Sequence, residues 1–229
     1  MKAALAIPED AAPADVVARL QAHVDTAQAR LRPQPFGLLP ALAQLLGEPG
    51  LKPGAAYSLD TEGALLQALL AGPSREGHWC GVVGMPAFAV EAAALAGVHL
   101  DRLVLVPEPG EQWLAVTAAL AEVVPVLAVR PSGRVRDSDA ARLGSRLRDR
   151  GGVLLVVGPW PRAEARLALG ERQWHGLGVG SGHLVSREVQ VQVASRRYPA
   201  GRRGWLRLPD PDGLVVASEP LRPGLQVVG

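Results

Sequence analysis

Short runs of aliphatic residues recur through the middle of the chain, and stretches with helical spacing lie between them. Each run is five to seven residues long and nearly free of charge, which is typical of strands buried on both faces of a sheet. The alternation of the two patterns predicts an α/β fold. The runs cover residues 55–59, 78–84, 102–106, 123–129 and 152–158. The predicted helices cover residues 39–46, 64–71, 88–95, 111–121 and 139–149.

The clearest unit lies in residues 95–131. The apolar run at 102–106 is followed by a proline-rich break and a stretch in which Trp113, Val116 and Leu120 recur at intervals of three and four. This spacing places the three side chains on one face of a helix. A second apolar run follows, so the unit reads strand, helix, strand. Such a unit implies a parallel sheet with right-handed crossovers.

The C-terminal third shows a different pattern. Residues 159–182 are irregular and predict an ordinary surface hairpin with Trp174 packed inward, although stacking of tryptophans and arginines on single-stranded nucleic acid is an alternative. Residues 188–195 alternate valine with polar side chains, as in a half-exposed strand. Two short strands at 205–208 and 214–217, joined by a hairpin turn, complete a predicted antiparallel extension.

An amphipathic helix precedes the first strand. Residues 13–31 place apolar side chains at near-heptad spacing, and a proline-rich break follows. A stripe of this kind either packs on the parent core or docks on a neighbour. The chain therefore divides into an N-terminal helix with a linker (1–35), a core (36–198) and a C-terminal β-hairpin with a tail (199–229).

Composition adds constraints on location and partners. The 229 residues include one cysteine, which excludes an internal disulfide framework and fits a reducing cytoplasm. We expect a cytoplasmic protein, because the N-terminus lacks the apolar core of a signal peptide and no apolar run reaches the length of a membrane span. The formal net charge is +2, yet all but two of the 24 basic residues are arginine, and they concentrate between Arg130 and Arg207.

This concentration of arginine predicts a basic face that contacts DNA or a partner protein. The alternative is a solvated surface in an arginine-rich composition. The candidate contact residues are Arg162, Arg166, Arg196, Arg197, Arg202 and Arg203.

The loop at residues 60–63 follows a strand and precedes a helix, which is where a phosphate-binding loop would lie. Such a loop needs a lysine for the phosphates and a hydroxyl for magnesium. Here Gly63 is followed by Ala64, and both groups are missing. Asp60 and Glu62 instead add carboxylates, each of which repels a phosphate charge at 4 Å by about 1 kcal/mol in water. The sequence therefore disfavours nucleotide binding at this loop.

Other catalytic patterns are also missing from the sequence. The five histidines do not pair at metal-ligand spacing, and no Gly-x-Ser-x-Gly elbow occurs. Cys80 lies inside an apolar run and is expected in the core. We therefore expect no enzyme, no cofactor and no metal.

The order of these elements resembles the core of RecA-type recombinases over residues 36–198. Residues 50–54 (GLKPG) are similar to the turn before the phosphate-loop strand of that family, and residues 95–120 match a strand, a Pro-x-x-Gly-Glu-Gln turn and a helix. Residues 141–150 resemble the next helix, and 183–197 a late strand ending in an arginine pair. The resemblance implies a mostly parallel central sheet flanked by helices, with an N-terminal helix and a C-terminal antiparallel β extension.

The departures from the family fall on its ATPase apparatus. Ala64 stands where the phosphate-loop lysine would be, and Pro86 falls near the activating glutamate. Arg130 takes about the position of the magnesium-assisting aspartate, and Gly158 with Pro159 replaces the nucleotide-sensing glutamine. The resemblance thus implies a degenerate nucleotide site, made of Asp60, Glu62, Gly63, Ala64, Pro86, Arg130 and Pro159.

A RecA-like core without its ATPase is similar to the ImuA family in its short actinobacterial form, often labelled SulA-like or RecA-like. This resemblance implies a non-catalytic accessory protein of damage-induced translesion synthesis, associated with the nucleoid during DNA damage. Its implied partners are an inactive Y-family polymerase homologue (ImuB), an error-prone C-family polymerase, RecA and single-stranded DNA. Analogy with recombinase filaments, in which an N-terminal helix contacts the next protomer, makes Val16, Leu20 and Val24 candidates for self-association.

Two other functions remain open at this point. A SulA-like inhibitor of cell division, which would bind the tubulin-like division protein, also has a RecA-like core without a phosphate loop. An active DNA-dependent ATPase is the third class, and the missing lysine argues against it.

Overall fold

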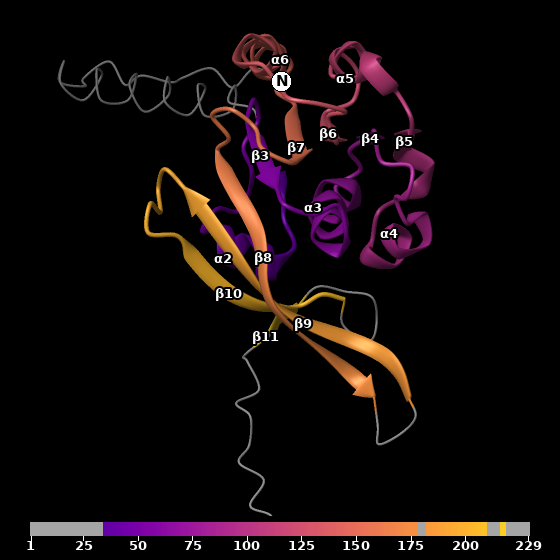
Figure 1. Ribbon diagram of the computed structural model, residues 1–229, viewed down its shortest axis with the longest axis vertical. Coiled ribbons are helices and arrows are strands. Elements are labelled where there is room, and N and C mark those ends of the chain that lie inside the picture. The colour runs from indigo at the N-terminus through magenta and orange to yellow at the C-terminus, as the bar shows by residue number, and fades with distance from the viewer. Residues whose placement is uncertain (1–33, 178–181, 210–215, 219–229) are drawn as a thin grey trace, which may run out of the picture. The chain divides into compact units, whose positions relative to one another are not determined.

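The computed structural model describes residues 34–177, 182–209 and 216–218. In this part of the chain, nine strands form one sheet in the order β11-β10-β9-β8-β3-β7-β6-β4-β5, and two short strands form a separate ladder (Figure 1). The parallel strands are β3 (Ala56–Leu59), β4 (Cys80–Val83), β5 (Leu103–Val106), β6 (Val126–Val129) and β7 (Val153–Val157). The separate ladder pairs β1 (Phe36–Gly37) with β2 (Gly50–Leu51).

The other half of the sheet is antiparallel. Its strands are β8 (Ala165–Leu177), β9 (Gly182–Ser195), β10 (Arg202–Arg207) and β11 (Val216–Ser218). Strand β8 joins the two halves, because it pairs parallel with β3 on one side and antiparallel with β9 on the other. A mostly parallel central sheet with an antiparallel C-terminal extension, as the sequence predicts, is confirmed.

Helices cover both faces of the parallel half. These are α3 (Ala64–Arg75), α4 (Val90–Ala96), α5 (Trp113–Leu120) and α6 (Asp137–Arg150), with 3-10 turns η1 (Leu100–Arg102) and η2 (Gly110–Gln112). Helix α2 (Pro40–Leu46) lies instead against β10 and β11 of the antiparallel half. One core cluster joins α2, α3 and α4 to one face of the sheet, and a second joins α5 and α6 to the other. Each fully buried leucine in these layers contributes about 1.5–3 kcal/mol to folding.

Helix α3 is buried along nearly its whole length. The sequence predicts its end near residue 71, but it continues through Pro73 to Arg75. Gly72 permits close contact with the ladder of β1, because a Cβ there would collide with the carbonyl oxygen of Gly37. Two buried polar side chains of α3 are bonded to backbone: Gln67 donates to Ala89, and Ser74 accepts from the amide of His99.

Two strand predictions in residues 102–129 need correction. Among the described strands β5 pairs with β4 alone and lies at the edge of the sheet, and Leu105 is 40% exposed, so the strand is not buried on both faces. β6 begins at Val126, while Val123 is 76% exposed in the preceding turn. Aliphatic composition alone does not distinguish an edge from a centre, because strand order is set by tertiary pairing.

The hairpin predicted at 159–182 is present as the antiparallel pair β8 and β9, but its first strand is long and regular where the sequence pattern is irregular. Most of this segment is the long strand β8, which is held by antiparallel pairing with β9. Trp174 is 49% exposed and does not pack inward; the guanidinium of Arg187 lies 5.3 Å from its ring centroid. Pairing with a neighbouring strand has overridden the weak local preference of a glycine- and arginine-rich sequence.

Some predictions fall outside the described residues. These are the helix at 13–31 with Val16, Leu20 and Val24, most of the turn after Leu208, and the tail from 219 onward. Within the described parts of the chain, no helix combines the length and the apolar character needed to cross a bilayer.

Candidate functional site

The carboxyl ends of the parallel strands meet at one edge of the sheet, which is the usual place for ligands in open α/β folds. The loop after β3 (60–63), Arg130 after β6, Pro86 after β4 and Pro159 after β7 all follow these ends. The seven residues of the degenerate nucleotide site therefore belong to neighbouring segments. We refer to this edge as the carboxyl edge.

Glu62 and Arg130 form an ion pair at the carboxyl edge. The Nη2 atom of Arg130 lies 3.2 Å from Oε2 of Glu62, and the two side chains are 45% and 29% exposed. The geometry is that of an ion pair without a hydrogen bond, since Oε2 is buried and accepts none among the described residues. The guanidinium neutralises the carboxylate from within the protein.

Arg130 is fixed by the ends of two strands. Its amide donates to the carbonyl of Val83 at 2.9 Å, which joins the end of β6 to that of β4. Gly84 follows with φ +77°, and a Cβ at this position would collide with the carbonyl oxygen of Arg130. Only glycine fits such a left-handed, crowded position. The backbone therefore holds Arg130 beside the loop after β3.

The loop after β3 is tied to β8. The carboxylate of Asp60 accepts a hydrogen bond of 2.9 Å from the amide of Leu169. Gly63 caps α3 through its carbonyl oxygen, which accepts from the amides of Leu66 and Gln67, and Ala64 is the first helical residue. The loop thus brings no lysine to the N-terminus of α3, and its one hydroxyl, that of Thr61, accepts from the amide of Gly63 at 3.4 Å.

The end of β7 is closed by backbone contacts. The Gly158 amide donates to the carbonyl of Leu59 at 2.7 Å, and its carbonyl accepts from the Ser58 hydroxyl at 2.6 Å. Pro159 and Pro86 are exposed and bring no polar side chain to the edge. In the part of the chain that the structure describes, no group of three or more His, Cys, Asp or Glu side chains is arranged to hold a metal ion.

Two open grooves meet at Trp160, one beside the carboxyl edge and one that extends to the segment before β3, and the sequence pattern did not predict them. One has a volume of about 450 Å³ and is bounded by Arg134, Val157 and Trp160; the other, of about 390 Å³, follows α6 past Arg148 and Arg162. Both grooves share Trp160 as a wall. The signal in the sequence is this tryptophan between two prolines directly after a buried strand.

The six candidate arginines are not brought together in one patch. Arg203 pairs in register with Gln192, and Arg166 with Ala194, so both lie on the sheet face opposite the buried Val191 and Val193. This pair is one group, which we call the sheet-face arginines.

The other four arginines lie elsewhere. Arg162 is exposed in the turn before β8, where its φ of 57° is unusual for a residue with a side chain. Arg196 and Arg197 follow the end of β9, and Arg202 opens β10. Arg197 and Arg202 lie over the ring of Tyr198, at 5.5 and 4.8 Å from its centroid.

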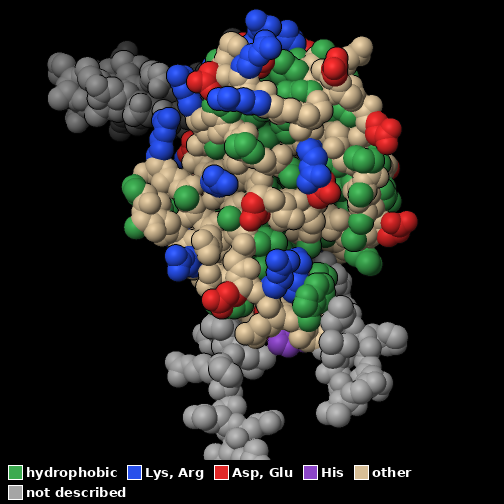
Figure 2. All heavy atoms as spheres, in the orientation of Figure 1, with side chains coloured by type: hydrophobic (Ala, Val, Ile, Leu, Met, Phe, Trp, Pro, Cys, Tyr) green, Lys and Arg blue, Asp and Glu red, His purple; other side chains and the backbone are tan. Residues whose placement is uncertain are grey.

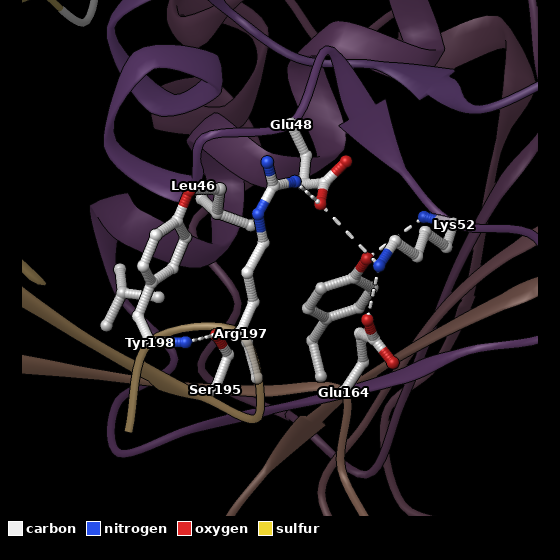
Figure 3. Close-up of a pocket in the computed structure, with 10 residues that line it drawn as sticks. Leu46, Glu48, Lys52, Glu164, Ser195, Arg197 and Tyr198 are labelled. Carbon is white, nitrogen blue, oxygen red and sulfur yellow. Dashed lines mark hydrogen bonds and ion pairs between the residues drawn. The ribbon is translucent and has the colours of Figure 1, made fainter. Parts of the chain in front are cut away.

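Arg197 belongs to a charged cluster at the amino ends of β3 and β8 (Figure 3). It donates to Glu48 at 2.7 Å, and this hydrogen bond raises the pKa of the guanidinium. Glu48 is 3.6 Å from Lys52, which in turn donates to Glu164 at 2.5 Å. The cluster encloses about 20 Å³, roughly the space of one water molecule. It is a cross-link between distant segments and has no room for a ligand.

A second charged cluster is buried in the antiparallel half. Glu188 is 1% exposed; it accepts hydrogen bonds from Ser218 at 2.6 Å and from Arg207 at 2.9 Å, and lies 3.4 Å from His175. The hydrogen bond from Ser218, followed by that from Arg207, lowers the pKa of Glu188 against the opposing effect of burial. The four residues come from β8, β9, β10 and β11, and the sequence did not indicate their contact.

One of the comparisons with known proteins is placed on the parallel half of the fold. A family model described as "MT3502 N-terminal domain" matches residues 44–162, from α2 to the turn before β8. The chain is also similar to "Uncharacterized protein Rv3395c" of Mycobacterium tuberculosis, with 32% identity over 124 residues. That alignment covers 53% of this chain and 61% of the mycobacterial protein, so the chain spans less than two thirds of its relative.

Proposed function

We propose for this chain, which belongs to the MT3502 N-terminal domain family, the role that its resemblance to the ImuA family implies. The region that the family model matches contains the carboxyl edge. In this role the protein is a non-catalytic, RecA-like accessory factor of damage-induced translesion synthesis. It acts in the cytoplasm, at the nucleoid during DNA damage. Its main contact is an inactive Y-family polymerase homologue, and RecA, an error-prone C-family polymerase and single-stranded DNA are further contacts.

The ion pair of Glu62 and Arg130 is the observation that carries this proposal. A nucleotide with magnesium needs a cation beside the phosphates and a carboxylate beside the metal. At the carboxyl edge the two charges occupy each other's places. The carboxylate of Glu62 lies in the loop before α3, where a cation is needed, and Arg130 follows β6, where a metal ligand is needed. Since each side chain satisfies the other, a bound nucleotide would have to break the pair and desolvate both groups.

Equilibrium binding of a fluorescent ATP analogue with magnesium tests the absence of nucleotide chemistry. We expect no saturable binding at micromolar concentrations, while a RecA-type recombinase measured in parallel binds. Micromolar, magnesium-dependent binding contradicts the proposal, and ATP hydrolysis stimulated by single-stranded DNA would indicate an active recombinase-type ATPase.

A pull-down with the full chain tests the partner. We expect capture of the inactive Y-family polymerase homologue and not of the tubulin-like division protein. The extension β9–β11, which adds three strands to the parallel core, supports this choice, because a minimal division inhibitor does not need it. Capture of the division protein alone would assign the chain to SulA-like inhibitors instead.

A further inference from the structure

The sheet ends at β5, and this end has the properties of a docking surface. β5 pairs only with β4, so its outward backbone groups have no strand partner among the described residues. Three leucines in successive elements next to it are exposed: Leu95 in α4 by 66%, Leu100 in η1 by 45% and Leu105 in β5 by 40%. We call these residues, with Leu103–Val106, the β5 edge. An exposed edge strand with apolar side chains is a template for an added strand.

The surroundings of the β5 edge are acidic. Residues 76–125 contain six acidic side chains and one arginine, whereas residues 130–209 contain sixteen arginines and six acidic side chains. Figure 2 shows acidic and hydrophobic side chains along the right-hand margin of the molecule, where Figure 1 places α4, β5 and α5. The negative charge is therefore concentrated at one end of the sheet.

The individual acids flank the strand. Glu91 is in α4, Asp101 is in η1 before β5, and Glu108 and Glu111 follow the end of β5; all four are exposed. In the described parts of the chain, Glu91, Glu108 and Glu111 form no ion pair, and Asp101 is 3.9 Å from Arg102. These carboxylates are therefore available to pair with basic side chains of a partner.

The arginines nearest to this surface are already engaged. Arg75 donates to the carbonyl of Ala96 at 3.1 Å, and Arg102 donates to the carbonyl of Gly77 at 2.8 Å. Both guanidinium groups are held against backbone oxygens, and in the described part of the chain Arg102 meets the flanking acids at Asp101 alone, at 3.9 Å. The net negative charge beside β5 persists.

This charge decides between two occupants. A second copy that paired β5 with β5 in antiparallel orientation would bring Asp101 of one copy towards Glu108 of the other, and like charges at such distances oppose association. A strand with basic side chains would instead bring positive charge to these carboxylates, and this attraction favours association. We propose that the β5 edge binds an extended segment of a partner protein in which aliphatic and basic side chains alternate, added as a strand beside β5. The proposal deepens the role of accessory factor proposed above, and it rests on that role for the existence of a protein partner.

In this arrangement the two sets of side chains have different roles. Leu103 packs against the core cluster of α4, so alternation puts Leu105 on the same side of the sheet, and the aliphatic side chains of the added strand cover it. The basic side chains then point to the opposite side of the sheet, that of α5, and reach Glu108 and Glu111 beyond the end of β5. Backbone hydrogen bonds give affinity, and the alternation gives specificity.

Fluorescence anisotropy with two labelled peptides and the full chain tests the proposal. The first peptide is a capped octapeptide that alternates valine with arginine and lysine, and the second carries glutamate in place of each basic residue. We expect only the basic peptide to bind, more weakly at high salt. Leu105→Arg and, separately, Leu95→Arg should weaken binding by about tenfold or more, as repulsive substitutions at a contact do.

The matched control is Val216→Arg, since Val216 is an exposed valine (36%) on β11, at the opposite edge of the sheet. It should change the affinity by less than about twofold, as distant surface changes do. Circular dichroism confirms that each variant is folded. Hydrogen exchange should slow at Leu103–Val106 when the basic peptide is added.

Equal binding of both peptides, unchanged affinity in the two leucine variants, or protection that bypasses β5 overturns the proposal. A dimer of the unliganded protein that Leu105→Arg abolishes overturns it too, and assigns the edge to a second copy. The role of accessory factor is tested independently of the docking site. If the wild-type chain binds the basic peptide but captures no inactive polymerase homologue, the docking site stands and the proposed function does not.

Discussion

The guanidinium of Arg130 lies 3.2 Å from the carboxylate of Glu62, at the edge of the sheet where an α/β ATPase would hold phosphate and magnesium. One residue follows β6 and the other precedes α3, so the contact spans two crossovers of the fold. Both side chains are partly exposed, which limits the contribution of the ion pair to the stability of the fold. Its importance lies in the positions of the two charges, because each stands where a nucleotide with magnesium would need the opposite charge.

The strength of this ion pair can be measured by a double-mutant cycle with Glu62→Gln and Arg130→Gln. We expect a coupling of about 0.2–1 kcal/mol, the range of solvent-accessible pairs. Arg130→Glu should cost more than Arg130→Gln, because it puts two carboxylates side by side. Urea denaturation of the wild type and the variants provides the free energies of unfolding. Identical stability of the Arg130→Glu and Arg130→Gln variants would show that the two side chains do not meet in solution.

The sheet-face arginines make a prediction about DNA that separates them from Arg197. If single-stranded DNA is bound, Arg166→Glu and Arg203→Glu should lower the affinity and reduce the slope of log K against log salt by about 0.7 for each phosphate that the protein no longer neutralises. Arg197→Glu should leave the slope nearly unchanged, since Glu48 already engages this guanidinium. Titrations of a labelled oligonucleotide at several salt concentrations measure all three. An equal effect of the three substitutions would contradict the division into groups.

Glu188 predicts a dependence of stability on acid. Hydrogen bonds from Ser218 and Arg207 lower its pKa in the folded state, so its ionised form contributes stability that is present above the pKa of the unfolded chain. This contribution is lost as the pH falls through the lower, folded pKa. Glu188→Gln should be less stable at pH 7 by about 1–3 kcal/mol, the cost of disturbing a buried polar network.

The control for Glu188 is the shape of the acid profile. Below pH 5 the wild-type free energy of unfolding should fall more steeply than that of Glu188→Gln, because the variant has no carboxyl to protonate. Parallel acid profiles would show that folding does not lower the pKa of Glu188.

Cys80 and Tyr57 predict a loss of stability in alkali. Burial raises the pKa of each side chain to about 12, from about 9 for a free thiol and about 10 for a free phenol. Between these values the unfolded chain releases protons that the folded protein keeps, so the free energy of unfolding falls as the pH rises. In Cys80→Ala this fall should be smaller between pH 9 and about 11.

Thiol reactivity supplies an independent measurement on Cys80. Its sulfur is buried in β4, so a thiol reagent at mildly alkaline pH should react slowly with the native protein and fully in guanidinium chloride. Rapid reaction of the native protein would place Cys80 outside the core.

The sequence by itself determined the layers of this fold. The purely aliphatic runs at 153–157 and 126–129 became central parallel strands, because only a site covered on both faces makes such runs favourable. The alternation of Val189, Val191 and Val193 with glutamines determined which face of β9 joins the core. The missing lysine at Ala64 and the acids before it were equally visible, since a phosphate-binding loop is defined by adjacent residues.

Tertiary structure alone decided the order of the strands and the charges that meet across it. The run at 103–106 is as apolar as its neighbours, yet it is the edge, because hydrogen-bond pairing between distant segments leaves no trace in local composition. The same holds for the contact of Glu62 with Arg130 and of Glu188 with Arg207, where each partner alone resembles an ordinary surface charge. Local periodicity reports which face a residue occupies, but strand pairing sets its neighbours, and that is why the acidic β5 edge could be recognised only after folding.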